Sequence, residues 1–299
     1  MPQTGQLAPA VDEKLTEGRL IVRGADRPGV VSTVSNILLE AGANIVSLDQ
    51  YSTDPSGGRF FQRTVFHVRD LDAMRPVLEE KLATHVGAGL GLDWRLVDTS
   101  RRKRVAIFAS RAEHCLVELL WRQRRGELDV DIVMVVSNHR DVEEVVRAFD
   151  VPFHHVPVVG GDKAAAEREH LRLLQGEVDF IVLARYMQIL SGEFIRDVQV
   201  PVINIHHSFL PAFVGAGPYQ KAKLRGVKLI GATAHYVTED LDEGPIIEQG
   251  VERVTHGDSV AELQRRGADV ERAVLARAVA WHSEDRVIRD GNTTIVFAP

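Results

Sequence analysis

The chain has 299 residues, enough for about two domains of ordinary size. Its hydrophobic content of 44% and charged content of 26% are typical of a globular protein with a sizeable buried core. The formal net charge of −6 gives no overall positive field, so we expect no nucleic-acid partner, and no apolar stretch is long enough to span a membrane.

The single cysteine, Cys115, excludes a disulfide framework within one chain, which fits a reducing, cytoplasmic compartment. Cys115 follows a helical pattern with Leu116 and Leu119, so a buried thiol is a simpler interpretation than a nucleophile. Residues 1–17 are polar and lack a basic segment followed by an apolar run, so we expect no signal peptide. We expect residues 1–18 to form a flexible N-terminus.

The predicted elements of the first part follow the order β-α-β-β-α-β. They are a strand at residues 20–23, a helix from residue 30 to 41, strands at 44–53 and 60–68, a helix at 71–86 and a strand at 92–97. Gly42 stops the first helix, and the turn Pro55-Ser56-Gly57-Gly58 separates the middle strands. Leu78 and Leu82 share one face of the second helix. This order predicts a ferredoxin-like domain at residues 19–99.

The turn Asp26-Arg27-Pro28-Gly29 leads into the first helix. With the order of elements, it resembles the ACT domain over about residues 19–97. Members of that family often bind a small metabolite, frequently an amino acid, at strand-edge interfaces between subunits. The resemblance implies that Asp26, Arg27 and Gly29 contact an amino-acid effector or a subunit interface, and that the protein forms a homo-oligomer. A purely structural or oligomerising domain is the alternative.

A different pattern begins after the basic run at residues 101–104, which we interpret as a solvated linker. Predicted strands at residues 105–109, 130–136, 153–156, 180–184 and 202–205 alternate with helices at 112–123, 141–149 and 164–175. This alternation predicts an α/β domain at residues 100–299 with a mainly parallel, Rossmann-like sheet. In such sheets the ligand crevice lies beyond the carboxyl ends of the strands.

The turn after residues 105–109 argues against a nucleotide cofactor. Ser110-Arg111-Ala112-Glu113 contains no glycine, so neither a dinucleotide fingerprint nor a phosphate-binding loop can form there. We therefore expect no nicotinamide, ATP or other cofactor.

Polar side chains gather near the end of the strand at residues 202–205. Asn204 and His206 are two residues apart, so on an extended strand they point to the same side. An amide beside an imidazole supplies a donor for a carbonyl oxygen and a proton carrier. A carboxylate from Asp242 can orient the histidine or take a proton from water. The three groups suit attack on an acyl or formyl carbon without a covalent nucleophile.

Two simpler interpretations of these histidines stay open. A histidine at a strand end is often structural, and His206, His207 and His235 also suggest a metal site with carboxylate help. Adjacent histidines on a strand point to opposite faces, so His206 and His207 do not easily share one metal. We therefore expect no metal.

The segment Asn204-Ile205-His206-His207-Ser208-Phe209-Leu210-Pro211 is followed, 36 residues after His206, by Asp242 within Leu-Asp-Glu-Gly-Pro. This arrangement resembles the formyltransferase domain of folate-dependent one-carbon enzymes over about residues 104–299. The family's catalytic Asn, His and Asp correspond to Asn204, His206 and Asp242.

Within that family the sequence is most similar to the deformylase subfamily, which hydrolyses 10-formyltetrahydrofolate. His207 stands where the purine-pathway transferase has proline, in a motif that runs on to Phe213. Glu113-His114-Cys115-Leu116 replaces that transferase's glycine-rich phosphate turn, and an ACT-like domain in front is the deformylase arrangement. One departure is Gly217-Pro218-Tyr219-Gln220, where the pattern has a basic residue before the proline and a histidine after the tyrosine.

The resemblance implies a hydrolase of a linear amide C–N bond that uses water as acceptor and supplies formate for purine biosynthesis. It places the pterin near residues 185–190 and 238–242. The residues expected to bind it are Arg185, Met187, Gln188, Ile189, Leu190, His235 and Thr238. Core packing is the alternative for the apolar ones. We expect His235 to follow a strand and to support the catalytic residues without direct contact to the reacting group, with a structural role as the alternative. Two rival functions are a formyltransferase with an amine acceptor and a catalytically inert ACT-domain metabolite sensor.

Overall fold

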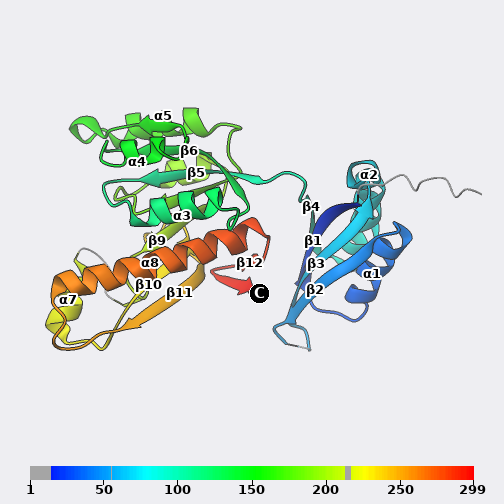
Figure 1. The fold of residues 1–299 in the computed structure, drawn as a ribbon. Coiled ribbons are helices and arrows are strands. Elements are labelled where there is room, and N and C mark those ends of the chain that lie inside the picture. The colour runs from blue at the N-terminus through cyan, green and yellow to red at the C-terminus, as the bar shows by residue number, and fades with distance from the viewer. Residues whose placement is uncertain (1–14, 55, 213–216) are drawn as a thin grey trace, which may run out of the picture. The chain divides into compact units, whose positions relative to one another are not determined.

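The computed structural model describes residues 15–54, 56–212 and 217–299. Its contacts divide the chain into two compact units, residues 1–101 and 102–299, and each is described here by itself (Figure 1). The division falls inside the basic run that we interpreted as a linker. That interpretation was partly wrong, because Lys103 and Arg104 are the first residues of strand β5.

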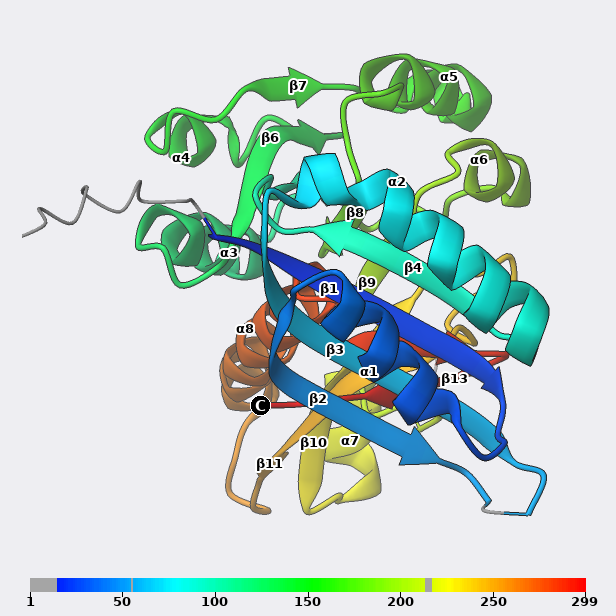
Figure 2. The same ribbon diagram turned by 90° about the vertical axis from the view of Figure 1, so that its right-hand side faces the viewer.

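The N-terminal unit is a four-stranded antiparallel sheet of order β2-β3-β1-β4 with two helices on one face (Figure 2). Its elements are β1 (Leu15–Ala25), α1 (Val30–Glu40), β2 (Asn44–Ser52), β3 (Arg59–Arg69), α2 (Leu71–Lys81), the π-helical η1 (Leu82–Ala88) and β4 (Asp93–Asp98). The ferredoxin-like prediction is confirmed. Leu78 and Leu82 are both fully buried, as their spacing predicted, although the helix there changes to π-helical geometry at Leu82.

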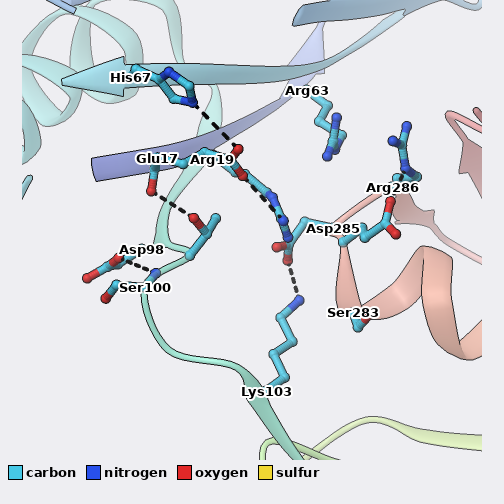
Figure 3. Close-up of polar contacts among 12 residues, drawn as sticks. Glu17, Arg19, Arg63, His67, Asp98, Ser100, Lys103, Ser283, Asp285 and Arg286 are labelled. Carbon is cyan, nitrogen blue, oxygen red and sulfur yellow. Dashed lines mark hydrogen bonds and ion pairs between the residues drawn. The ribbon is translucent and has the colours of Figure 1, made fainter. Parts of the chain in front are cut away.

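Strand β1 begins earlier than predicted. Residues 15–18, expected within a flexible N-terminus, pair with β3 from Leu15 opposite Arg69 onwards. Carboxylate oxygens of Glu17 lie 3.4 Å from Arg19 Nη2 and 3.8 Å from His67 Nε2, so side-chain contacts support the start of the strand (Figure 3). Residues 1–14 and Pro55, both covered by predictions above, lie outside the described residues.

The C-terminal unit is an α/β domain around a seven-stranded sheet of order β11-β10-β9-β8-β5-β6-β7. Strands β5 to β9 are parallel, whereas β10 and β11 are antiparallel, which confirms a mainly parallel sheet. The elements are β5 (Lys103–Ala109), α3 (His114–Arg124), β6 (Val130–Ser137), α4 (Glu143–Arg147), β7 (Phe153–His155), η2 (Val159–Gly161), α5 (Lys163–Leu174), β8 (Phe180–Ala184), α6 (Gly192–Asp197), β9 (Val202–His206), α7 (Pro218–Arg225), β10 (Leu229–Tyr236), β11 (Ile246–Arg253), α8 (Val260–Ser283), β12 (Val287–Asp290) and β13 (Thr293–Val296).

Both faces of the parallel strands are buried, as their continuous apolar sequences require. On β5, Val105, Ile107 and Ala109 belong to a core shared with α3, α4 and α8. Ala106 and Phe108 face the other way, into a core shared with α5 and α6. Helices therefore cover both faces of the parallel strands. No helix in the described part of the chain is both long and apolar enough to cross a membrane.

Helix α8, with 24 residues, was not predicted from the sequence. A capping box between Ser259 and Glu262 starts it, and it packs on α3 and on β9, β10 and β11 (Figure 1). Beyond its end, Asp285 accepts a hydrogen bond from Lys103 Nζ at 2.6 Å (Figure 3). The His282 carbonyl accepts a second hydrogen bond from the same atom at 3.1 Å. The start of β5 is thereby held against the end of α8.

Candidate active site

The carboxyl edge of the parallel strands has a topological switch point at β5. Strands β6 and β7 extend the sheet on one side of β5, and β8 and β9 extend it on the other. Such a point is where α/β sheets bind their ligands. Ser110 joins the two sides, because its Oγ donates to Asn138 Oδ1 at 2.7 Å and accepts from the Met187 backbone N at 3.0 Å.

Asn204 on β9 lies opposite His235 on β10, with its Nδ2 atom 3.2 Å from His235 Nε2. His235 Nδ1 lies 3.0 Å from the Tyr236 carbonyl oxygen. A carbonyl only accepts, so Nδ1 carries the hydrogen and Nε2 of the neutral ring accepts from the Asn204 amide. Burial lowers the pKa of His235, which supports the neutral form. His235 thus orients the Asn204 amide.

The position of His235 corrects one prediction. It lies within β10 rather than after a strand, where the pairing with β11 shifts register between Ala234 and His235. Bulges of this kind redirect side chains near functional sites. His235 is only 2% exposed, so it supports Asn204 from behind.

His206 and Asp242 form the second pair of the site. His206 Nδ1 lies 3.2 Å from Asp242 Oδ1, and the His235 Nε2 atom lies 3.7 Å from the same oxygen. The hydrogen bond from His206 lowers the pKa of Asp242, although burial opposes that effect, so the carboxyl is ionised at neutral pH. His206 Nε2 is buried and has no hydrogen-bond partner in the described part of the chain. One ring nitrogen is therefore fixed by Asp242, and the other is buried without a partner among the described residues.

The loop from Val237 to Pro245 brings Asp242 to His206. Asp242 has φ = 60°, a left-handed conformation that aspartate tolerates better than most residues. A Cβ atom on Gly244 would lie 1.8 Å from the Tyr236 carbonyl oxygen, so only glycine allows the loop to approach β10 this closely. Thr238, predicted to bind substrate, donates from Oγ1 to the Asp240 carbonyl at 3.0 Å.

The predicted pterin-binding residues that follow β8 differ from one another in exposure. Met187 and Ile189 are 57% and 56% exposed and can contact a ligand, and Gln188 is half-buried. Leu190 is buried in the core with Phe194. The alternative of core packing therefore holds for Leu190 but not for its two apolar neighbours.

We expected the two adjacent histidines to point to opposite faces of the strand, but they do not. Their ring centroids are 5.2 Å apart and their planes are tilted by 35°. The reason is that β9 ends at His206, so His207 already belongs to the following turn and escapes the alternation of a strand. Burial, and next the charge of Arg185, lower the pKa of His207 to about 4, so this ring is neutral at neutral pH.

A second buried carboxylate, Glu271 on α8, lies at the same edge of the sheet and was missed by the sequence analysis. Its Oε2 is 2.8 Å from His114 Nε2 and 3.5 Å from Arg185 Nε, and its Oε1 accepts from Tyr219 Oη at 2.7 Å. Burial raises the pKa of Glu271, but His114 and Arg185 together lower it below the ordinary value. We call these four residues the Glu271 cluster.

One sequence feature could have indicated a role for Glu271, because it is a charged residue on the buried face of an amphipathic helix. It shares that face with Gly267, Val274 and Leu275, at helical spacings of three and four. Gly267 is required there, because a Cβ atom would lie 1.9 Å from Tyr219 Oη. Tyr219 belongs to the atypical Gly217-Pro218-Tyr219-Gln220 segment, which forms the start of α7.

Three side chains of this region, His114, Cys115 and Glu271, have ligand atoms within 4.8 Å of one another, a spacing at which a metal can bind. The chemistry does not favour it. The carboxylate already faces His114, Tyr219 and the Arg185 cation, and a guanidinium opposes a second cation. Cys115 is 1% exposed, as predicted for a buried thiol, and burial raises its pKa, which disfavours the thiolate.

In the N-terminal unit, the turn of Asp26, Arg27 and Gly29 precedes α1. The Asp26 carboxylate accepts from Ser52 Oγ, and its backbone N donates to the Gly58 carbonyl at 2.8 Å. Gly29 has φ = 94° at the N-cap position, and Arg27 is exposed. Asp26 therefore stabilises the turn, and Arg27 is accessible to a ligand.

Both units match families of known proteins. Residues 103–279 match the family described as formyl transferase, and residues 18–83 match the ACT domain. The chain is 58% identical over 280 residues to the formyltetrahydrofolate deformylase of Mycobacterium bovis, covering 94% of this chain and 90% of that protein. It is 51% identical over 282 residues to the Bacillus subtilis formyltetrahydrofolate deformylase, covering 94% of each.

Solved structures distinguish the deformylases from the transferases. The formyltetrahydrofolate deformylase of Pseudomonas syringae superposes with a TM-score of 0.87 and 47% identity over 96% of both chains. A glycinamide ribonucleotide transformylase from Symbiobacterium toebii gives 0.63 and 29% identity, covering 68% of this chain and 97% of that one. These matches favour the predicted deformylase over an amine-accepting transferase or an inert sensor. The chain belongs to the formyl transferase family and, within it, to the formyltetrahydrofolate deformylases.

Proposed function

We propose that the protein hydrolyses 10-formyltetrahydrofolate to tetrahydrofolate and formate, and that Asn204, His206 and Asp242 carry out the reaction. The observation that carries the assignment is the buried, unpartnered Nε2 atom of His206, whose ring is held through Nδ1 by ionised Asp242. A proton carrier that is held at one nitrogen and has no protein partner at the other is suited to a reacting group.

In this mechanism, water attacks the carbon of the N10-formyl group and forms the new C–O bond. Asp242 positions the water and takes its proton, directly or through His206. The Asn204 amide, oriented by His235, and the His206 Nε2–H stabilise the oxyanion of the tetrahedral intermediate. The C–N10 bond then breaks, N10 receives the proton taken from water, and the formic acid formed loses its remaining proton to solvent and leaves as formate. The reaction needs only the folate substrate and water.

The folate is proposed to lie along the exposed Met187 and Ile189 side chains, beside half-buried Gln188 and the loop that carries Thr238 and Asp242. Apolar walls suit the pterin ring, and backbone groups of a rigid segment suit its polar edge. The Met187 backbone N, held by Ser110 Oγ, fixes the conformation of this segment.

The deciding experiment is a formate assay with purified protein and 10-formyltetrahydrofolate in the absence of any amine. We expect stoichiometric formate and tetrahydrofolate. Formate that is absent until an amine is added, with a formylated amine as product, would refute hydrolysis and identify a transferase. Folate binding without any turnover would instead support the inert sensor.

The N-terminal unit is proposed to regulate this reaction by binding an amino acid through the turn that contains exposed Arg27. We also propose that the protein is a cytoplasmic homo-oligomer that supplies formate for purine biosynthesis. Repeating the formate assay with glycine and with methionine tests the regulation. An unchanged rate with every amino acid would favour a structural role for the unit.

A further inference from the structure

A cavity of about 440 Å³ is lined by the Glu271 cluster and by His207, which follows the catalytic His206 in the chain. The residues of its wall that matter here are His114, Arg185, His207, Tyr219, Arg265 and Glu271. His207 is the neighbour of His206 and its ring lies 5.2 Å away, so the cavity is one side chain removed from the reacting groups. The proposed mechanism assigns no role to it.

Arg185 has the features of a binding residue in this cavity. Its Nε and Nη1 atoms are buried, and neither has a hydrogen-bond partner in the described part of the chain. The nearest Glu271 oxygen, 3.5 Å from Nε, is close enough for charge attraction but too far for a good hydrogen bond. Arg185 also has φ = 64°, an unfavourable conformation for a residue of its kind. Arg185 thus places a guanidinium in the wall of the cavity, and two of its nitrogens are desolvated without a hydrogen-bond partner among the described residues.

The proposed reaction produces a small anion next to this guanidinium. A neutral formyl group enters the reaction, and a formate anion leaves beside the ionised Asp242 carboxylate, which repels it. Guanidinium groups bind carboxylates through charge-assisted hydrogen bonds, often in bidentate geometry. His207 adds a neutral ring that can donate a hydrogen bond, because its burial beside Arg185 keeps it uncharged.

We propose that Arg185 and His207 form a product site that receives formate from the catalytic centre and releases it through the cavity. This inference rests on the proposed function. Glu271 has a defined part in it, because a carboxylate already beside Arg185 weakens the binding of a second one. Formate therefore binds weakly enough to leave after each turnover.

The test measures formate binding directly, without folate. ¹³C-labelled formate is titrated into the full-length protein, and the NMR line width reports the bound fraction. We expect Arg185→Gln to weaken binding about tenfold, because the charge-assisted contacts are lost. Glu271→Gln, of the same shape without the charge, is expected to tighten it about fivefold. Arg111→Gln, at an exposed arginine that does not line the cavity, is the matched control and should bind as the native protein does.

Opposite effects of the two substitutions are the signature of the site, because misfolding would weaken binding in both variants. Product inhibition of hydrolysis by formate should change in the same order. Equal binding by native protein, Arg185→Gln and Arg111→Gln would overturn the proposal, and so would chloride binding as tightly as formate with the same dependence on Arg185. Because binding is measured without folate, Arg185-dependent binding in a protein that releases no formate would refute the hydrolase instead.

Discussion

Two buried carboxylates at the same edge of the sheet differ in how completely their partners satisfy them. Glu271 is 2% exposed and faces His114, Arg185 and Tyr219. The Asp242 side chain is 10% exposed, and its main partner, His206, has a second ring nitrogen without a partner in the described residues. The first carboxylate is surrounded by protein donors, whereas the second is bonded to a histidine whose other ring nitrogen is left without a partner among the described residues.

Burial of a carboxylate can therefore contribute either to stability or to reactivity. A saturated carboxylate joins α3, α7, α8 and the end of β8, and its removal leaves several donors without an acceptor. The pair of Asp242 and His206, whose hydrogen bonds are incomplete, keeps the His206 Nε2 atom desolvated and available, which is the arrangement that catalysis requires. We therefore expect substitutions at Asp242 to change the rate and substitutions at Glu271 to change the stability.

The largest expected effect is on the rate of Asp242→Asn. The amide cannot take a proton or stabilise a positively charged His206, so kcat should fall on the order of 1,000-fold while folate binding is retained. Formate release and folate binding are measured separately. Asp240→Asn, at an exposed aspartate of the same loop, is the control and should retain the native rate. Native turnover by Asp242→Asn would show that the unsaturated carboxylate is not catalytic.

Glu271→Ala tests the other side of the comparison. Loss of a buried, saturated carboxylate should lower the free energy of unfolding of the catalytic unit by about 3 kcal/mol. Chemical denaturation of the full-length protein measures it. Asp269→Ala, at an exposed position of the same helix, should change it by less than about 0.5 kcal/mol. Equal stability of the two variants would contradict a structural role for the cluster.

His170 extends the comparison to a buried ring away from the sheet edge. Neither of its nitrogens has a partner in the described residues, and its ring packs against Phe108 and Phe194. Burial lowers its pKa from 6.5 to about 4. Below pH 6.5 the unfolded chain binds a proton that the folded chain does not, so stability falls as the pH drops towards about 4. The loss due to His170 is about 2 kcal/mol at pH 5.

His170→Phe should remove that part of the acid sensitivity, measured as unfolding free energy at pH 7.5 and pH 5. His256→Phe replaces an exposed histidine and should leave the pH dependence as it is in the native protein. An unchanged pH dependence in His170→Phe would mean that this unpartnered ring does not cost stability in acid.

The smallest effect is expected for Tyr219→Phe. Burial raises the pKa of Tyr219, so its hydroxyl remains a donor to Glu271 at neutral pH. Removing one of several donors should lower the unfolding free energy by about 1 kcal/mol and leave the rate of formate release near native. A large loss of rate would mean that Tyr219 takes part in the reaction. It would contradict the division between a catalytic Asp242 and a structural Glu271.

The sequence was most informative where the signals are local. Strong turns and apolar runs predicted the strands up to β9 and the α-helices between them except α6, which was missed. The spacing of Asn204 and His206 predicted that they share a side. Family resemblance was needed to add Asp242. Elements after β9 were mostly missed, because β11 is partly exposed and the buried face of α8 contains Gly267 and Glu271.

The Glu271 cluster could not be predicted from the sequence, because it depends on tertiary packing. His114 and Glu271 are 157 residues apart in the chain, and neither lies in a sequence motif that indicates a contact with the other. The same holds for His235, which could be placed behind Asn204 only once the pairing of β9 with β10 was known. Burial and pairing across strands decide such roles, and spacing along the chain does not reveal them.

The contact between Lys103 and Asp285 also determines where the ends of the catalytic unit lie. Arg286 follows Asp285, and its guanidinium donates to the Phe297 carbonyl at 3.1 Å, while the Phe297 backbone N donates to the Arg286 carbonyl. The first strand and the final residues of this unit therefore meet around residues 285–286. Neighbouring ends permit circular permutation. A gene that joins residue 299 to residue 102 through a short glycine linker, and opens at the exposed turn after α3, should encode an active enzyme with a new order of elements.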